Sequence, residues 1–325
     1  MNDICRTGRR AGTIASSALS ALSASSAVSV VCLSALFAMP AQAVEQGATI
    51  TPIGITDFGA GMLPPSSPYG TVGVRASYYS ASTLKDGAGK SIPNDFHIDV
   101  KTLALAYFYM TDVEVLGARL GVGGVLPFID ISGGLKVGTP GGPLAVSGRD
   151  SGLGDMQVMP FILAWQLPPS VFVNAGLMIQ APTGAYSTSN AFNAGVNHWT
   201  YSPFVGATYI TSSGFELSTQ VSLNVNTVNP ATRYRSGVEY RQEFAVGQHI
   251  QSWTAGLAGY VYRQLSDDSG PGSGDGNRGR VYALGPAVSF VQPGLPLVTL
   301  HGYKEFGARN RAEGYNLALR LAMTF

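Results

Sequence analysis

The amino-acid sequence predicts an all-β protein: a transmembrane, antiparallel, up-and-down β-barrel of about 12 strands, with 14 as the alternative. Three observations indicate this fold class. Charged residues make up only 12% of the chain and hydrophobic residues 45%, whereas a typical soluble domain is about 25% charged. No apolar run of about 18 residues follows the first 43 residues, so a membrane-spanning helix does not explain the shortage of charge. Finally, the C-terminal residues alternate between apolar and polar, as a strand does between lipid and a lumen.

Residues 1–43 are expected to be a cleaved secretory signal peptide. It has a basic start at Arg6, Arg9 and Arg10, an apolar core at residues 28–39, and an A-x-A cleavage site at residues 41–43. Both cysteines, Cys5 and Cys32, lie in it, so the mature chain has no disulfide or thiol chemistry. Removing it takes away three of the 20 basic and one of the 19 acidic residues, which leaves 17 against 18. This balance gives no electrostatic case for binding nucleic acid.

Residues 70–325 are expected to form the barrel. Twelve segments rich in Val, Tyr, Phe, Thr and Gly are long enough to cross a bilayer at a tilt. They are 70–82, 97–110, 118–131, 155–167, 171–181, 198–211, 215–227, 236–248, 252–264, 280–292, 296–306 and 312–325.

The alternation of side chains is clearest in residues 215–227. Leu217, Val221 and Leu223 share one face of this segment and are expected to face lipid, while Gln220 and Asn224 lie on the other face. A soluble β-sandwich would show the same alternation, so this strand alone does not decide between the two folds.

The connections between the segments favour the barrel. Long polar loops (84–95, 133–152, 182–197, 228–236, 266–279 and 307–314) alternate with short turns (111–115, 168–170, 212–214, 247–251 and 292–295). This is typical of a bacterial outer-membrane barrel with long loops outside, short turns in the periplasm and an even number of strands. Aromatic residues near the strand ends are expected to form the interfacial girdles: Tyr78, Tyr79, Tyr107, Tyr109, Trp165, Trp199, Tyr201, Trp253, Tyr260, Tyr262 and Tyr303.

Several stretches match the pattern of a known family, in order along the mature chain. The most specific are residues 151–155 (SGLGD) with Pro160 and Trp165, and residues 181–184 (APTG) with Tyr186. The others are residues 45–47, Asp57, Phe58 and 63–65; Asn193, Gly195, Asn197, Trp199, Thr200 and Pro203; and Tyr234, Ser236, Gly237 and Glu239. The chain thus resembles the MetA-pathway phenol-degradation family of outer-membrane transporters, also called SphA-like. The resemblance implies an outer-membrane barrel that takes up hydrophobic compounds. The terminal Phe325 of this chain resembles the signal by which the barrel assembly machinery recognises outer-membrane barrels.

No motif indicates a metal site, a cofactor or catalysis. The four histidines have no zinc-ligand spacing, and the GDGNRG stretch at 274–279 precedes a strand, so it is not a nucleotide-binding loop. Asp267, Asp268 and Asp275 fit a solvated loop better than a calcium site. A barrel-embedded lipid-modifying enzyme that uses a lone Ser with His301 is one alternative function.

The more polar face of each strand is assigned to the lumen. The candidate lining residues are Arg75, Asn174, Gln180, Glu216, Gln220, Asn224, Glu239, Arg241, Glu243, Thr299, His301, Glu305 and Arg320. Glu239, Arg241 and Glu243 also fit an internal ion-pair ladder without a role in transport. Twelve strands imply a narrow lumen. Some strands carry apolar or small residues on both of their faces, so part of the lumen wall is expected to be apolar. We therefore expect passive uptake of small hydrophobic or aromatic compounds, with a structural barrel without a specific solute and a secreted soluble sandwich as alternatives. The expected partners are the solute, outer-membrane lipid, lipopolysaccharide and the barrel assembly machinery.

Residues 44–69 form an irregular N-terminal segment. Four prolines and four glycines exclude a regular barrel strand there, because proline cannot donate to a strand ladder. The segment is nevertheless apolar for a free tail. It is expected either to be disordered or to fold into the lumen as a plug, with Ile53, Asp57, Phe58 and Leu63 as the candidate plug residues.

Overall fold

The structure, a computed structural model, describes residues 53–325. The expected signal peptide lies outside the described residues, as do residues 44–52 of the N-terminal segment. None of the helices in the described part is long and apolar enough to cross a membrane. The described chain forms thirteen strands: β1 (Thr71–Lys85), β2 (His97–Val115), β3 (Ala118–Thr139), β4 (Gly142–Leu153), β5 (Gln157–Leu167), β6 (Val171–Gln180), β7 (Thr200–Ile210), β8 (Phe215–Asn226), β9 (Glu239–Ile250), β10 (Trp253–Gln264), β11 (Arg280–Phe290), β12 (Leu297–Arg309) and β13 (Arg311–Thr324).

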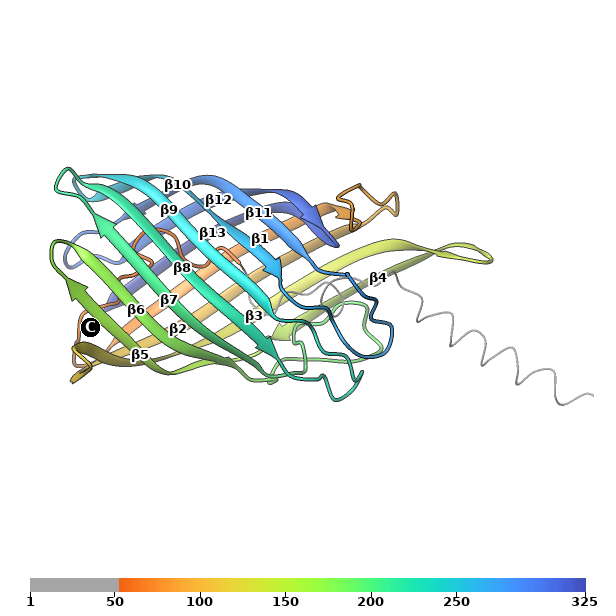
Figure 1. The fold of residues 1–325 in the computed structure, drawn as a ribbon, viewed down its shortest axis with the longest axis horizontal. Coiled ribbons are helices and arrows are strands. Elements are labelled where there is room, and N and C mark those ends of the chain that lie inside the picture. The colour runs from red at the N-terminus through yellow and green to blue at the C-terminus, as the bar shows by residue number, and fades with distance from the viewer. Residues whose placement is uncertain (1–52) are drawn as a thin grey trace, which may run out of the picture. The chain divides into compact units, whose positions relative to one another are not determined.

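Twelve of these strands close into one antiparallel barrel (Figure 1). Strands β1 to β3 and β5 to β13 pair in sequence order, and β13 pairs with β1 to close the ring. Closure pairs each of these twelve strands with a neighbour on both sides, so the backbone groups of the wall are satisfied without water, as hydrocarbon requires. The predicted fold class and the 12-strand wall are confirmed.

Strand β4 corrects one expectation, because residues 133–152 were predicted to be a long loop. Instead β3 continues to Thr139, and β4 pairs with its second half from Gly142 onward. Pro140 and Gly141 form the two-residue turn between them. In Figure 1 this hairpin extends beyond the end of the barrel opposite the C-terminus. The high content of Gly and Ser in this stretch hid an alternation that is regular once it is paired with β3.

The fourth wall strand is interrupted. The pairing of β3 with β4 ends at Phe128 and Leu153, and its pairing with β5 begins at Val125 and Gln157. Strands β4 and β5 therefore form one line along β3, broken at residues 154–156.

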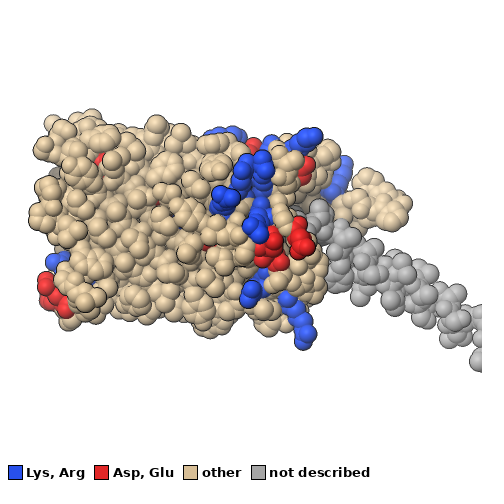
Figure 2. All heavy atoms as spheres, viewed as in Figure 1, with Lys and Arg blue, Asp and Glu red and all other residues tan. Residues whose placement is uncertain are grey.

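The outer wall is apolar. Large exposed side chains of the outward face include Leu103, Leu105, Val205, Leu217, Leu257, Leu300 and Leu317. Figure 2 shows a broad band without charged side chains on the visible face, with Lys, Arg, Asp and Glu gathered mainly at the end opposite the C-terminus. An apolar band outside and polar side chains inside are the arrangement of a barrel in a bilayer. The charged end is the extracellular one, because the C-terminus and the short turns lie at the other end.

The aromatic residues divide between the two faces. Trp199, Trp253 and Tyr107 are exposed on the outer wall, as a girdle requires. Four tyrosines that were predicted to belong to the girdles instead point inward: Tyr79, Tyr260, Tyr262 and Tyr303. Their position in the alternation of their strands, and not their closeness to the strand ends, decides which medium they contact.

The register of β8 can be tested by substitution. Val221 lies on the outward face near the middle of the strand, and the neighbouring Gln220 lies on the inward face. Val221→Arg should lower the free energy of unfolding by about 2–4 kcal/mol, because its charge would lie in hydrocarbon near the midplane. Gln220→Arg is the matched control and should cost far less. Urea unfolding in lipid vesicles measures both, and equal costs would contradict this register.

Candidate functional site

Residues 53–61 of the N-terminal segment lie against the inner wall of the barrel (Figure 1). Glu243 of β9 holds the first turn of these residues: the carboxylate accepts hydrogen bonds from the backbone N–H groups of Gly54 at 3.1 Å and Ile55 at 3.0 Å. The backbone N–H and the hydroxyl of Thr56 also donate to it. One buried carboxylate thus satisfies three consecutive backbone donors.

Other strands hold the rest of the segment. Arg75 and Asn316 donate to the carbonyls of Gly54 and Ile53, both at 2.9 Å. Further along, the Gly59 N–H donates to Glu216 at 2.7 Å. Asn174 donates to the Ala60 carbonyl at 2.8 Å, and the Gly61 N–H donates to Thr208 at 2.9 Å. Because the segment forms no strand ladder, side chains of the lumen satisfy its buried backbone groups.

Asp57 is the one charged residue of the segment within the described part, and it is buried, with 1% of its surface exposed. Its carboxylate lies 3.1 Å from Nη2 of Arg320 and 3.0 Å from Nδ1 of His301. The His301 ring stacks on Tyr303 with the ring centroids 4.1 Å apart. A buried carboxylate is tolerated when such partners compensate it.

A second polar cluster lies toward the extracellular end of the lumen. Glu305 accepts hydrogen bonds from the hydroxyls of Tyr79 and Tyr260, both at 2.8 Å. Glu239 accepts from Tyr262 at 2.9 Å and from Asn224 at 2.8 Å. The guanidinium of Arg311 lies over the Tyr262 ring at 4.4 Å and within 4.0 Å of Glu305. Sequence reasoning missed Arg311, because it placed residue 311 in a long loop, 307–314. Instead β12 ends at Arg309 and β13 begins at Arg311, with a tight turn at Asn310.

The inner faces of β10 and β11 form a mainly apolar wall, with Ala245 of β9 and Tyr303 and Ala308 of β12 beside it, and the described N-terminal residues pack on it. Small aliphatic side chains and tyrosine rings alternate there, and Ile53 and Phe58 of the segment join them in one buried cluster. Its wall members are Ala245, Ala258, Tyr260, Tyr262, Val281, Ala283, Ala287, Tyr303 and Ala308. The lumen thus has an apolar, aromatic wall on β10 and β11, flanked by charged inward side chains such as Glu243 of β9 and Glu305 of β12.

The structure places the predicted lumen residues as follows. Ten of the candidates named from the polar faces have buried side chains: Arg75, Asn174, Gln180, Glu216, Asn224, Glu239, Arg241, Glu243, His301 and Glu305. Thr299 is buried as well, and Gln220 and Arg320 are half-buried. Gln180 lies apart from the N-terminal segment, since its amide contacts Gln157 and Asp155. Of the candidate plug residues, Ile53, Asp57 and Phe58 are buried, whereas Leu63 is half-buried.

The most specific sequence stretches meet at the break in the wall. The Asp155 carboxylate accepts hydrogen bonds from the backbone N–H groups of Gly184 and Val196, each at 2.8 Å. A Cβ on Gly184 would lie 2.8 Å from backbone atoms of Gly154 and Gly195, so these three glycines allow the loop 181–199 to approach the wall. The loop 181–199 therefore covers the break, and the Asp155 carboxylate at the break holds it by hydrogen bonds.

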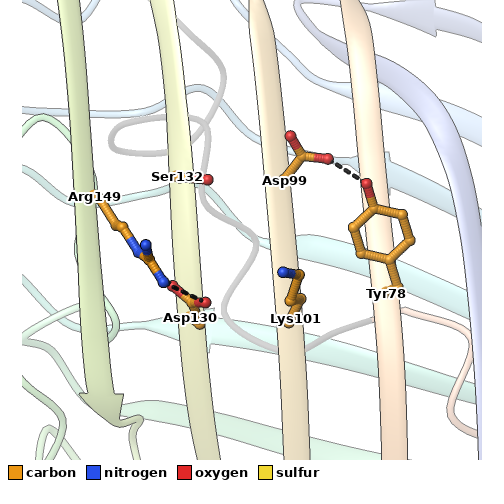
Figure 3. Close-up of a pocket in the computed structure, with 6 residues that line it drawn as sticks. All are labelled: Tyr78, Asp99, Lys101, Asp130, Ser132 and Arg149. Atoms are coloured by element: carbon orange, nitrogen blue, oxygen red, sulfur yellow. Dashed lines mark hydrogen bonds and ion pairs between the residues drawn. The ribbon is translucent and has the colours of Figure 1, made fainter.

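A cleft on the outer wall carries charges of both signs (Figure 3). Arg149 of β4 forms a two-point ion pair with Asp130 of β3, with both distances 3.0 Å, and Tyr78 donates a hydrogen bond to Asp99. Lys101 lies between these two pairs. Since the cleft faces outward, it is not part of the lumen. Within residues 53–325, no group of three or more His, Cys, Asp or Glu side chains is placed to hold a metal ion.

The profile of a family described as Putative MetA-pathway of phenol degradation matches residues 81–321. The chain belongs to this family. Among solved structures, the COG4313 outer membrane channel from Pseudomonas putida F1 is similar, with a TM-score of 0.69 and 16% identity over 81% of this chain and 100% of that one. The CymD monoaromatic hydrocarbon channel has a TM-score of 0.41 and 11% identity over 88% of this chain and 97% of that one. Identities this low concern the fold alone. No curated protein matches the chain. This MetA-pathway family member is thus a β-barrel of the bacterial outer membrane.

Proposed function

We propose that the protein is a channel for the passive uptake of small hydrophobic or aromatic compounds across the outer membrane. The observation that carries the proposal is the apolar wall of β10 and β11, where tyrosine rings and small aliphatic side chains face the lumen. A flat apolar solute gains free energy by leaving water for such a surface. Membership in a family tied to phenol degradation supports the same solute class. Catalysis is not part of this function.

The N-terminal segment acts as the plug of this channel, and the barrel of residues 70–325 is the conduit. Ile53 and Phe58 cover the apolar wall that a solute would use. Charged side chains of the lumen, Arg75, Glu243 and Arg320 among them, bind the segment's polar groups. Displacement of the segment would uncover an apolar path on one side and a polar path on the other.

Uptake of labelled toluene by cells with and without the gene tests the proposal. Expression should raise the initial rate of toluene uptake and leave the uptake of a labelled disaccharide unchanged. Equal rates with and without a folded barrel in the outer membrane would favour a structural barrel without a specific solute.

A matched pair of variants tests the apolar wall itself. Ala258→Asn places an amide on the apolar wall, where Ala245 and Gly285 lie directly opposite, and Ser222→Asn places the same amide on the inward face of β8. The Ala258 variant should lower the rate of toluene uptake, because the amide loses hydration without gaining a partner from these two residues. The Ser222 variant should take up toluene at the rate of the unsubstituted protein. Equal loss in both variants would contradict a path along the apolar wall.

The remaining expected partners are outer-membrane lipid, lipopolysaccharide and the barrel assembly machinery. The apolar outer wall supports contact with lipid, and the C-terminus supports recognition by the assembly machinery. Phe325 ends the closing strand, donates its N–H to the Gly70 carbonyl at 3.0 Å and has 55% of its surface exposed.

Deleting Phe325 should lower the amount of folded barrel in the outer membrane. The deletion removes an exposed terminal ring and two backbone hydrogen bonds, with Tyr69 and Gly70, at the seam between β1 and β13. Heat-modifiable gel mobility of the outer-membrane fraction measures the folded amount. Phe325→Tyr keeps the ring and the backbone and serves as the control. Normal levels after the deletion would remove the proposed role of the terminal residue.

A further inference from the structure

Three arginines form a row on the outer wall at its extracellular end. Arg263 of β10 is directly opposite Arg280 of β11, and Arg280 is directly opposite Arg309 of β12. Arg263 and Arg309 are exposed, and Arg280 is half-buried. Each lies on the outward face of its strand, because its neighbours Tyr262, Val281 and Ala308 are buried in the lumen.

The charge of this row is not compensated within the described part of the chain. None of the three arginines forms an ion pair with a carboxylate there. Arg280 donates only a long hydrogen bond, of 3.4 Å, to the Gly307 carbonyl, and its guanidinium lies 5.9 Å from the centre of the Tyr282 ring. Like charges directly opposite each other on neighbouring strands are destabilising. A row of three therefore indicates an anionic ligand from outside the chain.

An apolar groove of about 320 Å³ lies on the membrane side of the row. Its lining includes the outward side chains of Phe244, Val261, Tyr282, Leu284 and Phe306. Two of these residues, Phe244 and Leu284, lie directly opposite Gly259 on either side of β10, so no side chain of β10 lies between them at this level.

The groove and the row are adjoining parts of one surface. Tyr282 and Phe306 are directly opposite each other, and the next register pair toward the extracellular end is Arg280 and Arg309. The centroids of the two aromatic rings are 5.9 Å apart. A ligand that lies along the wall would therefore meet aromatic and aliphatic groups first and guanidinium groups at the level of the lipid headgroups.

We propose that this surface binds the bisphosphorylated, acylated disaccharide of outer-leaflet lipopolysaccharide, with phosphate on the arginine row and an acyl chain in the groove. The guanidinium fork matches phosphate geometry and binds it with two parallel hydrogen bonds. A row of three arginines suits a ligand with two phosphates, and the groove accepts one of its chains. A phospholipid with one phosphate would use only part of the row.

Other arginines at the same end of the barrel provide the contrast. Arg149 is paired with Asp130, and Arg278 is paired with Asp267 at 2.9 Å. The hydrogen bonds from Arg278 lower the pKa of the Asp267 carboxyl group. Because both arginines already have carboxylate partners, they are not expected to bind phosphate.

Native mass spectrometry of the detergent-solubilised full chain tests the proposal. The probes are bisphosphorylated hexa-acylated lipid A, its monophosphorylated and fully dephosphorylated forms, its deacylated disaccharide bisphosphate, phosphatidylglycerol and inorganic phosphate. The variants are the triple substitution R263Q/R280Q/R309Q and the control R149Q/R278Q. Heat-modifiable mobility checks that each variant is folded.

Lipid A should bind the triple variant at least about tenfold more weakly than the unsubstituted protein, since several charge-assisted hydrogen bonds are lost. The control should bind it normally. The unsubstituted protein should prefer lipid A over its dephosphorylated form, its deacylated form, phosphatidylglycerol and free phosphate. Unchanged affinity in the triple variant would overturn the proposal. Equal binding of bisphosphorylated and dephosphorylated lipid A to the unsubstituted protein would also overturn it, whether or not the variant folds, and equal binding of phosphatidylglycerol would show a general phospholipid surface instead.

Discussion

Deleting residues 48–66, with the signal peptide and its cleavage site kept, is expected to leave a folded barrel whose single-channel conductance is severalfold higher. The deletion removes Ile53 and Phe58 from the apolar wall and Asp57 from Arg320 and His301. Water and ions would then occupy the space, with the charged side chains of the lumen, Arg75, Arg320 and Glu243 among them, lining their path. Recordings in planar bilayers measure both conductance and ion selectivity.

The control for this deletion is a shortened extracellular loop. Residues 271–276 lie in the loop between β10 and β11, and five of these six residues are exposed. Their deletion removes a Gly- and Ser-rich stretch without changing the contacts of the N-terminal segment, so conductance should stay at the unmodified level. If the variant that lacks residues 48–66 is folded and its conductance is unchanged, the segment does not close the lumen.

Glu243→Ala is expected to release the first turn of the segment without removing it. The substitution leaves the N–H groups of Gly54, Ile55 and Thr56 without their common acceptor. Breaking such a buried, charge-assisted arrangement costs about 3–5 kcal/mol, and this loss should weaken the docking of the segment. Hydrogen exchange of the amides of residues 54–56 should accelerate, and the conductance should fluctuate between the closed level and the level of the deletion.

Glu239→Ala is the matched control for that substitution. Glu239 is a buried carboxylate on the same inward face of β9, and it binds Tyr262 and Asn224 but no residue of the segment. Its loss should lower the stability of the barrel and leave amide exchange at residues 54–56 unchanged. Equal acceleration in both variants would mean that Glu243 acts through the barrel as a whole.

The sequence predicted the wall well, for a physical reason. Each strand contacts lipid on one side, so alternation is imposed locally and can be detected segment by segment, as in Phe215–Asn226. Short turns and long loops then indicate the direction of each strand. The hairpin formed by Gly142–Leu153 was missed, because it extends beyond the wall and much of its composition is that of a loop.

The interior was predicted less completely. Alternation identifies the face of a strand, but it does not show which lumen side chains meet. The contacts between Glu243 and Gly54, or between Asp57 and His301, join residues 189 and 244 positions apart. The inward tyrosines were assigned to the girdles because an aromatic side chain near a strand end fits a girdle as well as it fits the lumen. Only the register of β10 and β12 shows that Tyr260 and Tyr303 face the lumen.

The location of the N-terminal segment has a consequence for the order of assembly. Its docking partners come from both ends of the barrel sequence, with Arg75 on β1 and Arg320 directly opposite on β13. Export through the expected signal peptide would deliver the segment before any strand, whereas its binding site is complete only when the last strand has paired with the first. Contacts of such long sequence separation form late, because the loop between them must first be closed. The segment would then be among the last parts of the chain to reach its native place, and its apolar residues would have to be kept from aggregating while the wall folds.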